Sequence, residues 1–172
     1  MKTVTALFIS LLFSCAVFSQ QSIKTGDAAP AFSASALDGR PVNLNDLRGK
    51  VVVLTFWSTV CQICHSEIPK LNQLASGFNG RDVVFLGVTT ENSSRVQPYL
   101  KKNPFSFTIV PDGFGMVLQY ADKDRRGNLD MGFPAYYLID QNGTVVMRGS
   151  GWDKTAMLSS QIERLLGKAR AD

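Results

Sequence analysis

Two cysteines three positions apart, Cys61 and Cys64, follow a continuous apolar run, Val51–Trp57. A run of β-branched and apolar residues is typical of a strand that is covered on both faces. Helical periodicity follows, so the cysteine pair lies where a strand ends and a helix begins. There the first sulfur meets the positive end of a helix dipole and unpaired backbone N–H groups, which favour the thiolate. Because the thiolate attacks disulfides, the spacing predicts a redox pair.

Length and composition exclude few classes of protein, but they indicate the number and size of domains. The chain has 172 residues, which predicts one domain with enough volume for a hydrophobic core. Its 45% hydrophobic and 19% charged residues describe an ordinary globular protein, so the class must come from motifs. The net charge of +4 is modest and the basic residues are spread along the chain, which argues against nucleic-acid binding.

The first residues resemble a secretory signal peptide. Lys2 precedes an apolar segment, Val4–Val17, that is too short to span a bilayer comfortably. Small residues near its end suit signal peptidase, with cleavage near Ser19 or Gln20. We therefore expect residues 1–19 to be a signal peptide.

An alternative is a lipoprotein signal in which Cys15 is lipidated, although Phe13 is bulky for that motif. If residues 1–19 are removed, the mature chain contains only Cys61 and Cys64 as cysteines. Either interpretation predicts a periplasmic or otherwise extracytoplasmic protein, in a compartment where disulfides persist.

The rest of the chain alternates between strand and helix patterns. Hydrophobic periodicity and turn signals predict a hairpin of residues 31–36 and 41–44, a short turn or helix at 46–50, strands at 51–57 and 83–88, helices at 62–78, 94–102 and 114–120, a hairpin over 135–148, and a last helix capped by Asp153. The polar segment 121–132 is expected to be an exposed loop. This order predicts an α/β fold, a mixed sheet with helices on both faces.

Several motifs in this framework, together with the cysteine pair, are specific. The chain resembles the thioredoxin superfamily and, within it, the TlpA/ResA-like extracytoplasmic thiol-disulfide oxidoreductases. The resemblance covers residues 26–168 and implies a thioredoxin-like domain with an N-terminal β-hairpin extension, a Cys61–Cys64 disulfide, and neither metal nor cofactor. It rests on Gly26, Asp27, Ala29, Pro30 and Phe32, on Leu44 and Leu47–Lys50, on Phe56–Cys64, on Glu67 and Pro69, and on Gly132–Pro134 with Tyr137–Asp140, Asn142 and Gly143.

The resemblance also implies a substrate-binding surface of Trp57, Phe133 and Pro134. Pro134 would be a cis-proline facing the dithiol, which leaves the backbone of Phe133 free to pair with an extended substrate. The alternative is that Pro134 merely starts an edge strand. Val60 stands where these proteins usually carry a second tryptophan, and Phe133 is larger than the residue usual before the proline. Both departures bear on which substrate is bound.

In the mechanism that we expect, Cys61 is the nucleophile and Cys64 the resolving thiol. Reduced Cys61 attacks a substrate disulfide, and Cys64 then releases the mixed disulfide. Gln62 and Ile63 carry no charge, so stabilisation of the thiolate falls mainly on the helix terminus. We expect a reducing to intermediate potential.

Deprotonating Cys64 in a half-buried site requires a base, and Glu91 is our candidate. It follows the predicted strand 83–88, and the TlpA/ResA-like proteins carry an acid at about this place. Alternatively, Glu91 simply precedes a helix capped by Asn92 or Ser93. Glu67, within the preceding helix, is expected to be solvated rather than catalytic.

Two rival functions follow from the same residues. Cys61–His65 is a literal match to the c-type haem attachment motif, with His65 as the axial ligand. No haem-sized helical pocket is evident in the pattern, and a surface histidine is the plainer interpretation. A peroxiredoxin-like antioxidant enzyme is the second rival. Ser58 suits it, but Leu54 stands where its proline would be.

By resemblance, the partners are extracytoplasmic proteins with disulfides to reduce, including apocytochromes c. A membrane electron donor of the DsbD/CcdA type would supply the electrons. We expect no nucleic-acid partner and, by default, a monomer.

Overall fold

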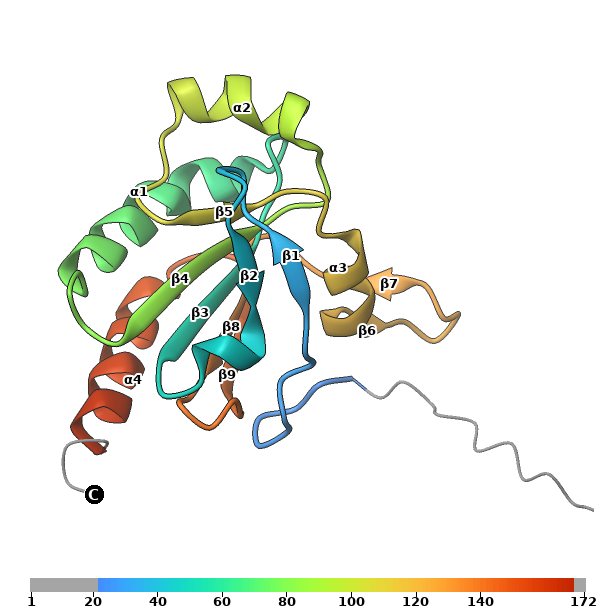
Figure 1. Ribbon diagram of the computed structural model, residues 1–172. Coiled ribbons are helices and arrows are strands. Elements are labelled where there is room, and N and C mark those ends of the chain that lie inside the picture. Colours follow the sequence, from blue (N-terminus) through green and yellow to red (C-terminus); the bar gives the residue numbers. More distant parts are fainter. Residues whose placement is uncertain (1–21, 169–172) are drawn as a thin grey trace, which may run out of the picture.

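The computed structural model describes residues 22–168, so the expected signal peptide and Cys15 lie outside the described residues. Five strands form a central mixed sheet in the order β5-β4-β3-β8-β9 (Figure 1). β3 is parallel to β4 and antiparallel to β8, β4 is parallel to β5, and β8 is antiparallel to β9. The strands are β3 (Val51–Phe56), β4 (Val83–Val88), β5 (Thr108–Val110), β8 (Ala135–Ile139) and β9 (Val145–Ser150).

β3 is central because both of its faces are apolar. All six of its residues are buried. Val51 and Val53 point to one core cluster, whereas Val52, Leu54 and Phe56 point to the other. Alternate side chains of a strand leave on opposite faces, so a continuous apolar run needs cover on both sides.

One face of the sheet packs against two helices, α1 (Gln62–Gly77) and α4 (Thr155–Lys168). Leu71 of α1, Phe78 directly after α1, and Leu158 and Ile162 of α4 are buried there. These residues recur at helical spacing, as the sequence predicts.

The opposite face packs against the N-terminal hairpin and α3 (Phe114–Tyr120). The hairpin consists of β1 (Ser33–Ser35) and β2 (Pro41–Asn43), followed by the 3-10 helix η1 (Leu44–Leu47). This confirms the N-terminal β-hairpin extension. The hydroxyl of Tyr120 donates to the carbonyl of Pro30 at 2.8 Å, which fixes α3 against the N-terminal segment.

The N-terminal segment reaches both edges of the sheet. At the β9 edge, the N–H of Gly26 donates to the carbonyl of Val145 and the N–H of Val145 donates to Asp27. At the β5 edge, the N–H of Leu37 donates to the carbonyl of Ile109 at 2.8 Å. We call residues 26–37 the strap.

α2 (Ser93–Lys102) lies over the end of the sheet at which β3 stops (Figure 1). Val96 of α2, Trp57 after β3, Cys64 and Ile68 of α1, and Ile109 of β5 form a third apolar cluster. The cysteine pair therefore lies on an ordered core.

Two details differ from the sequence prediction. β5 was not predicted, because three residues after a proline-containing loop give no usable periodicity. The segment 121–132, expected to be a loop, contains the two short paired strands β6 (Asp122–Lys123) and β7 (Leu129–Asp130). The carboxylate of Asp124 closes their turn by accepting from the N–H groups of Arg126 and Asn128, at 2.8 Å each.

In the part of the chain that the structure describes, no helix has the length and apolar character needed to cross a membrane.

Candidate active site

Cys61 and Cys64 are joined by a disulfide, with their Cα atoms 5.2 Å apart. Cys61 is the N-cap of α1, and its sulfur accepts a hydrogen bond from the N–H of Cys64 at 3.1 Å. Cys61 is partly exposed, whereas Cys64 is fully buried. The two sulfurs therefore differ in access, and only the first is reachable at the start of the helix.

The Phe133–Pro134 peptide bond is cis, as the resemblance implied. Phe56, the last residue of β3, pairs with Ala135, so Pro134 lies at the end of the sheet from which the chain runs to the cysteines. Phe133 packs against the apolar cluster that contains Cys64 and Trp57. Within residues 22–168, no hydrogen bond engages the backbone of Phe133.

Trp57 lies beneath the site rather than at its surface. Its side chain is 1% exposed and packs against the rings of Tyr99 and Phe105, with centroids 5.5 and 4.6 Å away. The part of the expected substrate-binding surface that was assigned to Trp57 is therefore buried in this structure. Tyr99 of α2 and Phe105 of the loop after it supply the aromatic cover, which the local sequence around Trp57 does not reveal.

Glu91 holds the loop that leads into the cysteines. Its two carboxylate oxygens accept hydrogen bonds from the N–H of Thr59 at 2.8 Å and from the hydroxyl of Thr59 at 2.6 Å. Thr89 donates to the same carboxylate at 3.2 Å, and Arg95 lies 3.7 Å away. The side chain of Glu91 is 18% exposed. Glu91 thus lies at the site and contacts it through Thr59, two residues before Cys61.

His65 contacts the same loop from the helix. Its Nε2 lies 3.0 Å from the carbonyl oxygen of Thr59, and its ring packs against Tyr99 at 5.4 Å. Burial, together with the charge of Glu91, raises the pKa of Tyr99. The two cysteine sulfurs are bonded to each other and His65 faces Thr59, an arrangement that fits the redox pair.

Glu67 is fully buried, so the expectation of a solvated residue is wrong. Its carboxylate accepts hydrogen bonds from Lys70 at 2.8 Å and from the N–H of Asp153 at 3.0 Å. Lys70 also donates to the carboxylate of Asp153 at 2.6 Å. Hydrogen bonds to Asp153 and Glu67 raise the pKa of Lys70, and Lys70 lowers the pKa of Asp153. Burial, together with the charge of Glu67, raises the pKa of Tyr136 on β8.

The loop between β9 and α4 therefore meets the site, which the sequence did not suggest. Asp153 was expected to cap the last helix, but α4 begins at Thr155 and the Asp153 side chain binds Lys70. The N–H of Gly151 donates to the carbonyl of Pro134 at 2.9 Å. Between these two attachments lies Trp152, which is 52% exposed.

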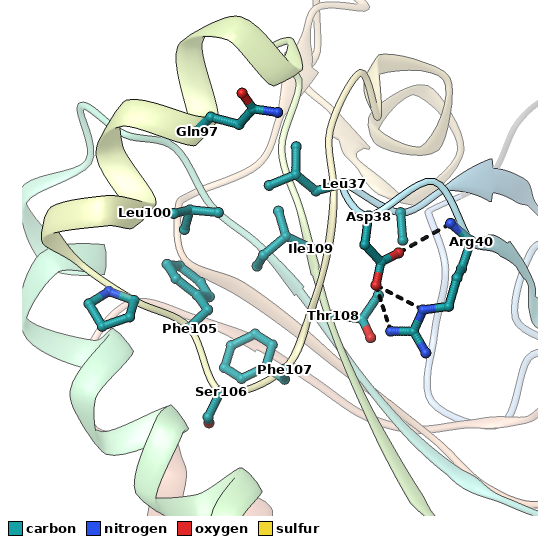
Figure 2. Close-up of a pocket in the computed structure, with 12 residues that line it drawn as sticks. Leu37, Asp38, Arg40, Gln97, Leu100, Phe105, Ser106, Phe107, Thr108 and Ile109 are labelled. Atoms are coloured by element: carbon teal, nitrogen blue, oxygen red, sulfur yellow. Dashed lines mark hydrogen bonds and ion pairs between the residues drawn. The ribbon is translucent and has the colours of Figure 1, made fainter.

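A cavity of about 670 Å³ lies on the other side of the aromatic cover (Figure 2). The β1–β2 turn, α2 and the segment leading into β5 line it, and neither cysteine does. Phe105 connects the two regions, because it lines this cavity and packs against Trp57. The ion pair between Asp38 and Arg40 lies among the lining residues.

Comparisons with known proteins agree with this geometry. The sequence matches the AhpC/TSA family over residues 25–148. A relative named thiol-disulfide oxidoreductase ResA, from Geobacillus thermodenitrificans, is 32% identical over 151 residues, which cover 84% of this chain and 83% of the relative. The thioredoxin-like protein YneN of Bacillus subtilis is 30% identical over 126 residues, covering 72% and 69% of the two chains.

Solved structures show the same fold. A thiol:disulfide interchange protein of the thioredoxin family from Chlorobium tepidum superposes with a TM-score of 0.70 at 25% identity, covering 84% of this chain and 99% of that one. A secreted disulfide oxidoreductase from Mycobacterium tuberculosis gives a TM-score of 0.62 at 26% identity, covering 78% and 96%.

Proposed function

The chain belongs to the AhpC/TSA family and is a thiol-disulfide oxidoreductase with a thioredoxin fold, and on that premise we propose that it reduces protein disulfides outside the cytoplasm. The observation that carries the proposal is the Cys61–Cys64 disulfide at the start of α1, with one sulfur accessible and the other buried.

The proposed reaction is a two-step exchange. The thiolate of reduced Cys61 attacks one sulfur of a substrate disulfide, forms a mixed disulfide and expels a substrate thiolate, which takes up a proton. Cys64 then loses its proton and attacks the sulfur of Cys61. This restores the Cys61–Cys64 disulfide and releases the second substrate thiol. Two electrons pass from the dithiol to the substrate.

The geometry supports this assignment of roles. The sulfur of Cys61 lies at a helix N-terminus and already accepts a backbone N–H, an arrangement that stabilises negative charge on sulfur. Cys64 is shielded from any bulky disulfide and can reach only the sulfur of Cys61. The order of attack follows from this difference in access.

For substrate binding, we propose that Phe133 and Pro134 form the docking edge. The unpaired backbone of Phe133 can bond to an extended peptide, in the manner of strand addition. The contact of Phe133 with the cluster around Cys64 supports this placement.

For Glu91, the proposed role is to accept the proton of Cys64 in the second step. Its partly exposed carboxylate and its hydrogen bonds to the loop before Cys61 support a place at the reaction centre. The alternative is that Glu91 only positions Thr59 through these hydrogen bonds. A conservative variant can separate that role from proton transfer.

The proposed setting is periplasmic or otherwise extracytoplasmic. Supporting it are the signal-like residues 1–19 and the similarity to a disulfide oxidoreductase described as secreted. We propose disulfide-containing proteins such as apocytochromes c as substrates and a DsbD/CcdA-type membrane protein as electron donor. The protein is proposed to act as a monomer.

Trapping of mixed disulfides tests the proposal. Cys64→Ser in the reduced protein should accumulate mixed disulfides with oxidised partner proteins, because the resolving thiol is gone. Cys61→Ser, the matched control, should trap none. The adducts are detected by non-reducing electrophoresis and mass spectrometry. Absence of adducts with Cys64→Ser contradicts the proposal, and rapid turnover of peroxide by the wild type would favour the peroxiredoxin alternative instead.

A further inference from the structure

We propose that Trp152 is a specificity-determining residue of this site, and that its indole packs against an apolar side chain next to the reacting cysteine of an extended polypeptide substrate. The inference rests on the proposed function and names the class of substrate that the site prefers.

Trp152 directly follows the residue that is hydrogen-bonded to the docking edge. Ala135 pairs with Ser150 in the antiparallel ladder of β8 and β9. Continuing that register by one step sets Pro134 opposite Gly151. The N–H of Gly151 donates to the carbonyl of Pro134, which agrees with this pairing. Phe133 directly precedes Pro134 and Trp152 directly follows Gly151, so the two aromatic residues flank this hydrogen bond. We therefore expect an extended peptide that pairs with Phe133 to run close to the indole.

The loop that carries Trp152 is held on both sides. Gly151 is bonded to Pro134, and Asp153 is bonded to Glu67 and Lys70 of α1. Gly151 and Asp153 have positive φ angles of 78° and 54°, a conformation that turns the chain sharply at both flanks of the tryptophan. The indole is thus displayed on a fixed support, which lowers the entropy that binding would cost.

The chemistry around Cys61 favours an apolar contact. Val60, directly before Cys61, is 69% exposed, and Trp152 is 52% exposed. The side chains between the cysteines, Gln62 and Ile63, are uncharged. A tryptophan offers a large apolar face at a small entropic cost and is enriched among residues that dominate binding energy. An aromatic or long aliphatic side chain is the partner that gains most from this surface.

The test compares two disulfide-bonded peptides that differ at the residue after the reacting cysteine, Leu in one and Ser in the other. A small disulfide, hydroxyethyl disulfide, measures the chemistry alone. Trp152→Ala should lower kcat/KM for the Leu peptide by about five- to tenfold, mostly through KM, and change the other two substrates less than about twofold. Trp152→Phe should restore most of the loss. Phe114→Ala, which removes an exposed aromatic ring on α3, is the matched control and should change nothing.

The outcomes are distinguishable. If the two peptides are reduced equally well by the wild type, or if Trp152→Ala slows all three substrates alike, the inference is overturned while the proposed function stands. If the wild type reduces neither peptide, the proposed function fails first.

Intrinsic fluorescence adds a binding signal, because the chain has only two tryptophans and Trp57 is buried. The Leu peptide should shift the emission of Cys61→Ser and leave that of Cys61→Ser with Trp152→Phe unchanged.

Discussion

Thr59 is the residue through which ionisable side chains reach the cysteines. Glu91 binds its N–H and its hydroxyl, and His65 faces its carbonyl. Thr59 thereby has every polar group engaged within a loop that would otherwise be free to move. The position of Cys61, two residues later, depends on partners from α1 and from the loop after β4.

A conservative change at Glu91 separates its two roles. Glu91→Gln keeps oxygen and nitrogen atoms within reach of Thr59 but removes the charge that accepts a proton. If Glu91 is the proton acceptor for Cys64, the release of mixed disulfides should slow by roughly 10²-fold. Stopped-flow kinetics of mixed-disulfide release, with alkylation of Cys64 across pH, measures this.

Glu91→Ala is the comparison, since it also releases Thr59. A pH profile for Cys64 in Glu91→Gln that matches the wild type would remove Glu91 from proton transfer. If Glu91→Ala alone slows the reaction, the residue acts by positioning the loop.

The sequence predicted the positions of residues that depend on a local pattern. It did not predict burial that depends on contacts with residues distant in the chain. Cys61 and Cys64 could be placed from a strand followed by a helical pattern. The burial of Trp57 and Glu67 could not be predicted, because the groups that cover them come from α2 with the loop after it and from the loop after β9. The helical periodicity of α1 carries no information about a partner 86 residues away.

At the scale of elements, long apolar or amphipathic segments were predictable and short ones were not. β3, α1, β4 and the hairpin of β8 and β9 carry their own periodicity or turn signal. β5 has three residues and is defined by its pairing with β4, a tertiary contact that single-sequence patterns do not contain.

Gly87 shows how tightly β4 and β5 are fitted beside the site. A Cβ atom at this position would lie 2.8 Å from Ile109, 3.1 Å from Phe107 and 3.2 Å from the indole nitrogen of Trp57. Gly87→Ala should therefore destabilise the fold by about 1–3 kcal/mol, because three neighbours must shift. Urea denaturation followed by circular dichroism gives the free energy of unfolding.

Gly115→Ala is the control for this prediction. Gly115 lies in α3, and an added Cβ meets no atom within 4 Å. Alanine favours the helix by up to about 1 kcal/mol over glycine, so this variant should be neutral or slightly more stable. A Gly87→Ala variant as stable as Gly115→Ala would contradict the prediction, because the apolar cluster beneath the site would then accommodate the added methyl group without loss of stability.

At the scale of the whole molecule, Arg148 joins segments that are distant in sequence. From β9 it forms an ion pair with Asp122 of β6 and donates to the carbonyl of Ile23. The hydrogen bond from Arg148 lowers the pKa of Asp122. The ion pair is about one-third exposed on each side, so water screens part of its strength.

This ion pair predicts sensitivity to acid. A carboxyl group whose pKa falls on folding stabilises the folded state above its unfolded pKa of about 3.9, and that contribution is lost as the pH drops through the lower folded value. Asp122→Asn should cost about 1 kcal/mol at pH 7. It should also flatten the loss of stability below about pH 4. Thermal unfolding at a series of pH values measures both effects. Asp46→Asn, at an exposed carboxylate of η1, is the control. Equal pH profiles for Asp122→Asn and the wild type would contradict the prediction.

The strap bears on whether this protein aggregates. A sheet with open edges offers unpaired N–H and C=O groups to any neighbouring chain, and strand addition then proceeds from molecule to molecule. Here one stretch of chain bonds to β9 at one end and to β5 at the other. Loss of that stretch to a protease would free these groups of β9 and β5 at the same time, and both strands could then pair with other chains.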